Sequence, residues 1–549
     1  MSCEVHYNAA SRTWFGPRGK DFYGPEMTLG EVIMRVLQIN ADQVMQHCDP
    51  TGEELTGAQL AQQSARIAQA FKRLGLYRGD VIGISANNTT YLTSVVIAAL
   101  LRGIPINPLH PELAEETVKY MYDITEPKLI FCDVENYPTI QAVNQRLVTP
   151  ATIYLLNGRL EGVRDVSELL NEDESITAAA YVPCPKLHGD HTAFIVCSSG
   201  TTGMPKGVTR SHRSLLCNCK NPNTYTRDSI LLSFSPLYWI SGTIILLASL
   251  LNGFRRIITN RPYSVDYLLQ LVATHRVTFL FLASHQIALL SKHDSDFEKL
   301  KAQLESVRVL IGAGSKVCKA VFRRMYELIG NQRFIIGYGL SEMGGLSKNV
   351  GGPLGCEGKV MRNVELRVVD KLKMPLGINE VGIIYARLRY HWEGFYRNPE
   401  ATARTLSPDV SEASVFGAPD LVDTNLTACA VVRTAKGALL LELKDASKET
   451  AQLLREDIGT VLGGKAEARA LTQQTRLEML DLDEMATSED VRKAFSEQMG
   501  ITLDVDAIKS LRPGFGGTQR AIICLPATLA TKALSVGKVK VAWSVCRIR

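Results

Sequence analysis

Helical and strand signals alternate along residues 27–190, and this alternation limits the folds open to the chain. Thr56 and Gln59 make a capping box before a helix whose apolar positions continue to Gly75. The next apolar run, VIGIS at residues 81–85, predicts a short buried strand. Strands separated by helices are typical of βαβ units on a parallel sheet. We therefore predict an α/β multidomain protein whose large part contains parallel sheets.

The same alternation predicts the elements that follow. We expect a helix to about residue 102 and one opened by Pro111, then a helix at 264–274, with strands at 104–106, 128–133, 277–281, 307–311 and 334–336. From about residue 364 the pattern changes to short β segments, at 365–370 and 382–388. A small β region should therefore follow the parallel sheets.

Composition narrows the class of protein. With 549 residues, the chain is long enough for several domains, and 46% hydrophobic with 21% charged residues is globular. The 61 basic and 56 acidic side chains nearly balance, so charge alone does not call for a polyanionic partner. Twelve cysteines without a CxxC pair favour reduced, intracellular thiols.

Targeting signals are the next question. The most apolar run, residues 239–251, is too short for a membrane span and predicts a buried helix, so we expect no transmembrane segment. The first residues lack a secretory signal pattern, and the last ones, CRIR, are not an SKL-type address. We expect a cytoplasmic protein, and a peroxisomal ancestry stays open.

The stretch FIVCSSGTTGMPKGV, residues 194–208, carries the clearest chemistry. An apolar strand runs directly into small polar residues closed by a lysine: Ser198, Ser199, Gly200, Thr201, Thr202, Gly203 and Lys206. Glycines let backbone N–H groups approach an anion, hydroxyls add donors, and Lys206 adds positive charge. A Walker A loop would need Ser or Thr after the lysine, where Gly207 stands. We predict a phosphate-binding loop; the alternative is an exposed Ser/Gly linker.

Two glycine-bearing segments follow later strands. The first is Gly312-Ala313-Gly314, and the second is GYGLSE, which contains Tyr338, Gly339, Ser341 and Glu342. Turns just after sheet strands are where open α/β folds bind ligands. By composition alone the first segment is equally an ordinary turn, and Glu342 is more often a solvated loop acid.

The pair SSGTTGMPKGV and GYGLSE resembles the adenylate-forming superfamily, which includes acyl-CoA synthetases, 4-coumarate–CoA ligases and luciferases. The resemblance covers about residues 20–405. It implies that the loop from Ser198 to Lys206 holds the β- and γ-phosphates of ATP. It also implies that Tyr338, followed by Gly339, lies against adenine, and that Gly312 to Gly314 border adenine and the acyl pocket.

The resemblance further implies a catalytic set of Lys206, Ser341 and Glu342. Ser341 would contact the α-phosphate, and Glu342 would bind Mg²⁺. The physical logic agrees, because a carboxylate beside phosphates is repelled unless a hard cation bridges them. The implied cofactors are ATP, Mg²⁺ and CoA, and the implied partner is a small-molecule carboxylic acid. The enzyme class is then an AMP-forming acid–thiol ligase.

Three further segments bear on this resemblance. Many relatives have a histidine near the position of Trp239, so the identity of the acid stays open; the alternative is that Tyr238 and Trp239 simply pack in the core. His212 is interpreted as a structural histidine. Gly394-Phe395-Tyr396, followed by Asn398-Pro399-Glu400, matches a turn of the family.

After residue 405 the family pattern breaks. The Asp that would grip the ribose, the hinge and the late lysine of the small domain are missing. We predict an adenylation domain at 1–405, a remnant of the small domain at 406–434, half a ferredoxin-like βαβ segment at 435–475 and a ferredoxin-like (βαββαβ) module at 476–549. The last two resemble the Gag-like proteins of non-LTR retrotransposons.

Two functions therefore stand side by side. The first is ATP-dependent adenylation and thioesterification of a carboxylic acid, impaired by the missing small domain. The alternative is an inactive chimera with residual ATP binding and weak nucleic-acid contact through 476–549. Residues 507–549 hold eight Lys or Arg and no Asp or Glu, but the strand RAIICLP at 520–526 lacks base-stacking aromatics. A solvated basic face is the favoured interpretation of that charge.

Overall fold

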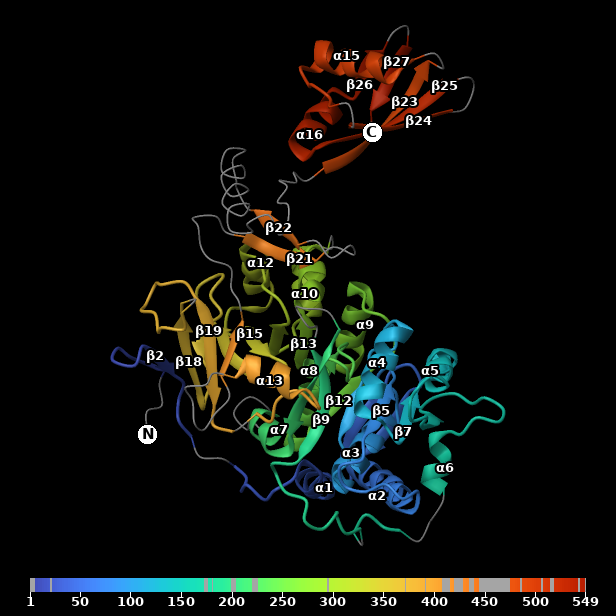
Figure 1. The fold of residues 1–549 in the computed structure, drawn as a ribbon, viewed down its shortest axis with the longest axis vertical. Coiled ribbons are helices and arrows are strands. Elements are labelled where there is room, and N and C mark those ends of the chain that lie inside the picture. The colour runs from blue at the N-terminus through green and yellow to red at the C-terminus, as the bar shows by residue number, and fades with distance from the viewer. Residues whose placement is uncertain are drawn as a thin grey trace. The chain divides into compact units, whose positions relative to one another are not determined.

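The computed structural model describes residues 5–19, 22–171, 176–179, 181–198, 204–219, 226–293, 296–370, 372–390, 392–406, 415–418, 428–433, 439–443, 474–483, 486–504, 507–513, 518–541 and 544–548 (Figure 1). The chain divides into two compact units, Met1–Val422 and Asp423–Arg549. Each unit has a hydrophobic core of its own. Within the described ranges, none of the helices combines the length and hydropathy that a membrane crossing requires.

Six strands form the first sheet of the larger unit. Their order is β10 (Lys206–Ser211), β9 (Thr192–Ser198), β6 (Ile106–Pro108), β5 (Ile82–Ser85), β7 (Leu129–Cys132) and β8 (Thr152–Leu155). All neighbours are parallel except β10, which runs antiparallel to β9. The inner strands are buried along their length, as expected for a parallel sheet with helices on its faces.

Nine strands form the second sheet. Their order is β17 (Lys359–Val360), β16 (Gly344–Val350), β15 (Phe334–Leu340), β14 (Val309–Ala313), β13 (Phe279–Ala283), β11 (Ile230–Ser233), β12 (Arg255–Ile258), β3 (Val44–Cys48) and β4 (Glu53–Thr56). The six strands from β15 to β3 are parallel, and the outer strands β4, β16 and β17 pair antiparallel. The predicted parallel α/β architecture is confirmed.

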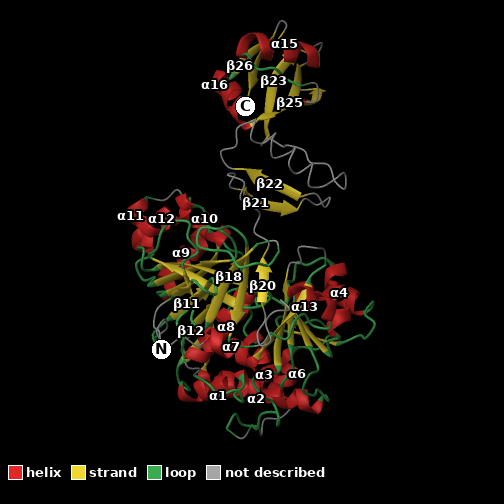
Figure 2. Ribbon diagram, turned by 60° about the vertical axis from the view of Figure 1, so that its left-hand side comes forward, coloured by secondary structure: helices red, strands yellow, loops and turns green. Residues whose placement is uncertain are grey.

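Helices follow most of these strands and cover the sheets, as Figure 2 shows in red. They are α1 (Leu29–Ile39), α2 (Gly57–Arg73), α3 (Leu92–Arg102), α4 (Glu115–Thr125), α5 (Tyr137–Asn144), α6 (Val166–Asn171), α7 (His212–Cys219), α8 (Ile240–Asn252), α9 (Val265–His275), α10 (Ser284–Ser291), α11 (Phe297–Gln303), α12 (Lys319–Ile329) and α13 (Pro399–Thr405), with a 3₁₀ turn at Val134–Asn136. The predicted capping box is present: the Thr56 hydroxyl accepts from the Gln59 amide, and the Thr56 amide donates to the Gln59 side chain. Gly103 ends α3 at φ +66°.

A small antiparallel sheet accounts for the predicted β region. Its order is β1 (His6–Asn8), β2 (Thr13–Phe15), β18 (Val364–Val369), β19 (Ile383–Leu388) and β20 (Val415–Ala418). The two N-terminal strands were not expected from the sequence. Sheet formation therefore joins the first residues of the chain to a segment 350 residues later.

Several predicted boundaries were wrong. Pro111 lies in a turn, and α4 begins only at Glu115. The glycines of GYGLSE continue β15 instead of forming a turn, and Gly312 and Ala313 likewise belong to β14. Position 339 needs a glycine because two stretches of backbone approach each other closely there: a Cβ on Gly339 would lie 2.2 Å from the carbonyl oxygen of Gly344.

The smaller unit contains two sheets. A pair of antiparallel strands is formed by β21 (Ala428–Arg433) and β22 (Leu439–Leu443). Five antiparallel strands follow in the order β24 (Ile508–Pro513), β25 (Thr518–Pro526), β23 (Gln474–Asp483), β27 (Ser544–Ile548) and β26 (Lys538–Val541), with the helices α15 (Ser488–Met499) and α16 (Ala527–Val536). Residues 444–473, which contain most of the predicted βαβ segment at 435–475, lie outside the described residues.

The ferredoxin-like classification of 476–549 and the domain limits at 405, 434 and 475 stay predictions. Part of the basic charge predicted for this module is neutralised by its own strand β23. Arg520 Nη1 lies 3.5 Å from Glu478 Oε1, and Arg547 Nε lies 2.6 Å from Asp481 Oδ2. These pairs are solvent-exposed and contribute little stability, but they reduce the charge that a polyanion would meet.

Candidate functional site

The two ends of the predicted phosphate loop face each other across a strand pair. Ser198 is the last residue of β9, and Lys206, the first residue of β10, is its antiparallel partner. Residues 199–203, which carry the other predicted loop positions, lie outside the described residues. The Lys206 ammonium lies over the Phe395 ring, 4.9 Å from its centroid. This cation–π contact orients the lysine at the base of the loop.

The predicted turn at Gly394-Phe395-Tyr396 packs along β10. The Tyr396 amide donates to the Gly207 carbonyl at 2.7 Å, and the Thr209 amide donates to the Gly394 carbonyl at 3.2 Å. Val208 and Phe395 form an isolated antiparallel bridge. The strand that carries Lys206 is therefore held on both sides, by β9 and by this segment.

The segment of β10 and α7 also anchors the turn between β15 and β16. That turn contains Ser341 and Glu342, the last residues of GYGLSE. Arg210 Nη1 donates to the Ser341 carbonyl at 2.9 Å, and Asn218 Nδ2 donates to the Met343 carbonyl at 3.3 Å. The fold thus brings together two motifs that are separated by more than a hundred residues.

Charges of opposite sign meet at this junction. Burial raises the pKa of the half-buried Glu342 carboxyl, while the positive charges of Arg210 and Lys206 act to lower it. Arg210 is only 1% exposed, and burial lowers its pKa to about 10. It therefore stays charged at neutral pH. Its Nη2 finds no hydrogen-bond partner among the described residues.

The segment Gly312 to Gly314 lies beside GYGLSE through the pairing of β14 with β15. Gly312 is the register partner of Ile336, and a Cβ on Gly312 would lie 2.3 Å from Ile287 Cδ1, so a larger residue would have to displace that methyl group. Gly314 has φ +106°, which favours glycine as well. Tyr338 is half-buried within β15. These predicted nucleotide-binding residues are neighbours in the fold.

Comparison with known proteins identifies the family. The model of the family described as "AMP-binding enzyme" matches residues 37–396. The chain belongs to the AMP-binding enzyme family. The sequence is 29% identical over 380 residues to 4-coumarate–CoA ligase 3 of Arabidopsis thaliana, covering 65% of this chain and 65% of that protein. It is 25% identical over 373 residues to luciferin 4-monooxygenase of Photuris pensylvanica, covering 65% and 68%.

Solved structures agree on the fold of this AMP-binding protein. The luciferase-like enzyme of the nonluminescent mealworm Zophobas morio superposes with a TM-score of 0.65 at 23% identity, covering 78% of this chain and 99% of that one. A red-emitting luciferase of Phrixothrix hirtus gives a TM-score of 0.64 at 23% identity, covering 73% and 95%. The matched region spans about two thirds of the length of the curated relatives.

A metal ion in an AMP-binding site of this kind would have few protein ligands. The described residues contain no group of three or more His, Cys, Asp or Glu side chains that could hold one. Mg²⁺ nevertheless fits here, because it keeps several waters and is commonly held by one or two carboxylates together with substrate phosphates. Glu342, half-buried beside two cations, can supply one such carboxylate.

Two aromatic residues and one histidine complete the predicted surroundings. Tyr238 is buried and lies edge-on to His110 at 5.7 Å, whereas Trp239 is 49% exposed. Packing in the core is therefore right for Tyr238 and wrong for Trp239. His212 is fully buried, its Nδ1 accepts from the Leu29 amide at 3.2 Å, and burial lowers its pKa to about 3. Its interpretation as a structural histidine agrees with this geometry.

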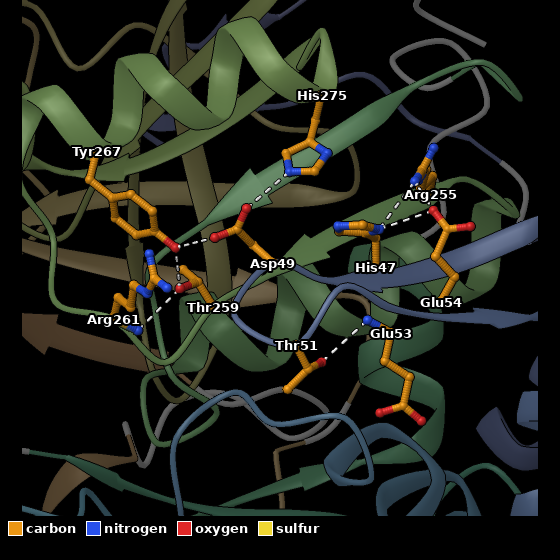
Figure 3. A network of polar contacts seen from close by, with 10 residues as sticks. All are labelled: His47, Asp49, Thr51, Glu53, Glu54, Arg255, Thr259, Arg261, Tyr267 and His275. Carbon is orange, nitrogen blue, oxygen red and sulfur yellow. Dashed lines mark hydrogen bonds and ion pairs between the residues drawn. The ribbon is translucent and has the colours of Figure 1, made fainter.

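Another polar network lies at the opposite end of the nine-stranded sheet (Figure 3). Asp49 accepts hydrogen bonds from Tyr267 at 2.7 Å and His275 at 3.2 Å, and these bonds lower the pKa of its carboxyl although burial alone would raise it. His47 and Arg255 both contact Glu54. Because these charged groups pair with one another, the network ties β3, β4, β12 and α9 together.

Proposed function

We propose that this protein adenylates a carboxylic acid with ATP and passes the acyl group to CoA, as an AMP-forming acid–thiol ligase. The observation that supports this most is the junction of the two motifs, where Lys206 and Arg210 converge on Glu342. Cations and a carboxylate at the base of a glycine- and hydroxyl-rich loop suit a polyphosphate with a hard cation. The enzyme names of the relatives, 4-coumarate–CoA ligases, point the same way.

Each predicted residue has a role in this proposal. The loop from Ser198 to Gly203 and Lys206 would hold the β- and γ-phosphates, and Ser341 would contact the α-phosphate. Tyr338 and Gly339 would lie against adenine, with Gly312 to Gly314 at the border of the acyl pocket. Glu342 would hold Mg²⁺, which supplies positive charge at the phosphates when bound.

In the first step the substrate carboxylate attacks the α-phosphorus of ATP, pyrophosphate leaves, and an acyl adenylate forms. Negative charge develops on phosphate oxygens in this step, and Lys206 together with the loop donors would stabilise it. In the second step the CoA thiol attacks the acyl carbon, and AMP leaves. Two proteins of this fold were solved with ATP and with anthranoyl-AMP, respectively.

The test is pyrophosphate exchange into ATP with a panel of fatty and aryl acids. We expect acid-dependent exchange that Lys206→Ala abolishes. Lys301→Ala, on the exposed face of α11, is the matched control because Lys301 lies outside the site. Absence of exchange with every acid, in a protein that is folded by circular dichroism, would refute adenylation.

A second candidate is an inactive chimera with residual ATP binding, in which residues 435–549 come from a Gag-like protein. It is favoured by the extent of the family match, which ends at residue 396 and leaves the 153 residues that follow unmatched. Binding of Mg-ATP without pyrophosphate exchange would support this candidate, whereas exchange without CoA thioester formation would support a ligase impaired in its second step. Salt-sensitive retention of single-stranded RNA by the full chain, lost after charge reversal at Lys538 and Lys540, would support a nucleic-acid partner. A cytoplasmic location remains part of either proposal.

A further inference from the structure

A cavity of about 690 Å³ lies at the C-terminal ends of α2 and α3, where Ile176 and residues 181–186 form one wall. Four basic residues line it: Lys72, Arg78, Arg102 and Lys186. No Asp or Glu is among its lining residues, and none of the lining residues belongs to the site described above. Its volume is in the range of small-molecule sites. A cavity with four cations and no anion calls for a negatively charged occupant.

The wall of this cavity is held in place by hydrogen bonds to its backbone. At one end the Gln62 side chain binds the Ile176 carbonyl and accepts from the Ala178 amide at 3.0 Å. Further along, the Cys184 amide donates to the Leu101 carbonyl at 3.0 Å. At the other end Arg78 Nη1 donates to the Lys186 carbonyl. The cavity is therefore formed before any ligand arrives, which lowers the entropic cost of binding.

Two buried polar groups on the wall, Arg102 Nε and the Tyr181 hydroxyl, make no hydrogen bond of good geometry within the described part of the chain. Arg102 is only 9% exposed; its Nη2 donates to the Leu76 carbonyl at 3.2 Å, but its Nε has no hydrogen-bond partner among the described residues. The hydroxyl of Tyr181 makes no hydrogen bond of good geometry among the described residues, although the neighbouring Arg102 side chain acts on its pKa as a hydrogen-bond donor would, which leaves the hydroxyl proton without an acceptor. Burial raises the pKa of Tyr181 to about 12 despite the nearby Arg102 charge, so the hydroxyl stays protonated and can donate. Buried polar groups are almost always paired, so both indicate a missing acceptor.

Helix capping explains only part of this arrangement. Basic residues near helix C-termini complement the helix dipole, and this accounts for Lys72 in α2 and Arg102 in α3. It does not account for Arg78 and Lys186, which lie in loops. Nor does it explain why Arg102 Nε and the Tyr181 hydroxyl find no acceptor among the residues that the structure describes. Asp80, the carboxylate near Arg78 in sequence, accepts from the Tyr77 amide at 2.7 Å and does not line the cavity.

We propose that this cavity binds a small organic anion, a carboxylate or phosphate ester on an apolar body. Arg102 and Tyr181 would donate to the anionic head in the buried part of the cavity. Lys72 and Lys186 would add positive charge at the exposed rim, where both side chains lie in solvent. The apolar body would lie against Ile176, Val182, Pro183 and Pro185. This site is independent of the adenylation site and does not rest on the proposed function.

The probes are octanoate and octyl phosphate, with octylamine as the matched cation and inorganic phosphate as the head group alone. Calorimetric titration uses the full chain in the absence of ATP, so that no acid is adenylated, and the rim variants described below distinguish this cavity from the acyl pocket. We expect saturable binding of both octyl anions at one site. Binding of octylamine with equal affinity would overturn the proposal.

Charge reversal at the rim then tests the location. Lys72→Glu with Lys186→Glu should weaken binding at least tenfold, whereas Lys301→Glu should not change it. Arg102→Leu should weaken binding further if that variant folds; the rim pair, being exposed, keeps the test valid if it does not. Unchanged affinity in the rim variant would place the anion elsewhere and overturn the assignment. Binding to anionic vesicles without binding to the monomeric anions would overturn it too, in favour of a membrane surface.

Discussion

Replacement of Arg210 by leucine should separate folding from function in this protein. Arg210 is fully buried, binds the carbonyl of Ser341 and faces the carboxyl of Glu342. Leucine keeps much of the apolar stem but removes the charge and the donor. The turn at 341–343 would then keep only the Asn218 contact from this segment. We expect the variant to fold and to bind Mg-ATP poorly.

The magnitudes follow from the structure. Burial lowers the pKa of Arg210 from 12.5 to about 10, so holding the charge in the interior costs about 3 kcal/mol. Leucine removes this cost but loses a hydrogen bond from a charged donor, worth about 1.5–3 kcal/mol. The two terms nearly cancel in the free energy of unfolding. Nucleotide binding should reflect only the lost hydrogen bond, so we expect the affinity for Mg-ATP to be about 10- to 150-fold weaker.

The assay pairs urea unfolding with calorimetric titration of Mg-ATP. Arg210→Lys is the matched control, because lysine keeps the charge without the planar fork of donors and should recover part of the affinity. A folded Arg210→Leu protein that binds Mg-ATP as tightly as the wild type would refute this role. If the wild-type protein itself does not bind Mg-ATP, the proposed function fails first, and the two failures are thus distinguishable.

Two further substitutions test buried titratable groups, both by urea unfolding across a pH series. Asp133 is 2% exposed, accepts from the Asn87 amide at 2.7 Å, and has a pKa raised by burial from 3.8 to about 6. The charged form of Asp133 therefore destabilises the fold by about 3 kcal/mol above pH 6, and this penalty disappears as the pH falls to 3.8. Asp133→Asn should thus be more stable than the wild type at pH 7.5 and equally stable near pH 4. No difference at pH 7.5 would contradict this. His212, with a pKa lowered from 6.5 to about 3, stabilises the fold above pH 6.5 and loses that contribution as the pH falls. His212→Leu leaves the Leu29 amide without its acceptor, so this variant should be about 1–3 kcal/mol less stable than the wild type at pH 8. On acidification to pH 5 the variant should lose less stability than the wild type. An equal loss of stability in both proteins would argue against a neutral buried imidazole.

Local signals in the sequence correctly predicted those features of the larger unit that depend only on neighbouring residues. The Thr56 capping box and the glycine that ends α3 at residue 103 act over a few residues, so the sequence shows them directly. The glycines of GYGLSE were misread as a turn because a local signal cannot distinguish a turn from a close approach of two strands. At Gly339 the cause is β16, which folds back onto β15. The assignment of strands to two separate sheets is also a long-range property.

The candidate site shows the same difference between features that local motifs reveal and features that depend on distant residues. The phosphate loop and Glu342 were found through motifs, whereas Arg210 and Asn218 were missed. An arginine in a strand next to a loop would ordinarily be exposed, and its burial depends on a partner 131 residues away. The nearest signal was the placement of Arg210 four residues after Lys206, on the same face of a strand. Whether the residues at 199–203 bind phosphate stays a prediction.

That shared face gives β10 a double role in the proposed chemistry. Its first residue, Lys206, closes the loop, and its fifth, Arg210, holds the turn that carries Glu342. Hydrogen bonds from β9 on one side and from residues 394–396 on the other fix the backbone between them. The lysine and the carboxylate therefore cannot move independently, because both are tied to one strand. Preorganised charge of this kind is effective in catalysis because it needs no rearrangement as negative charge develops on the phosphates.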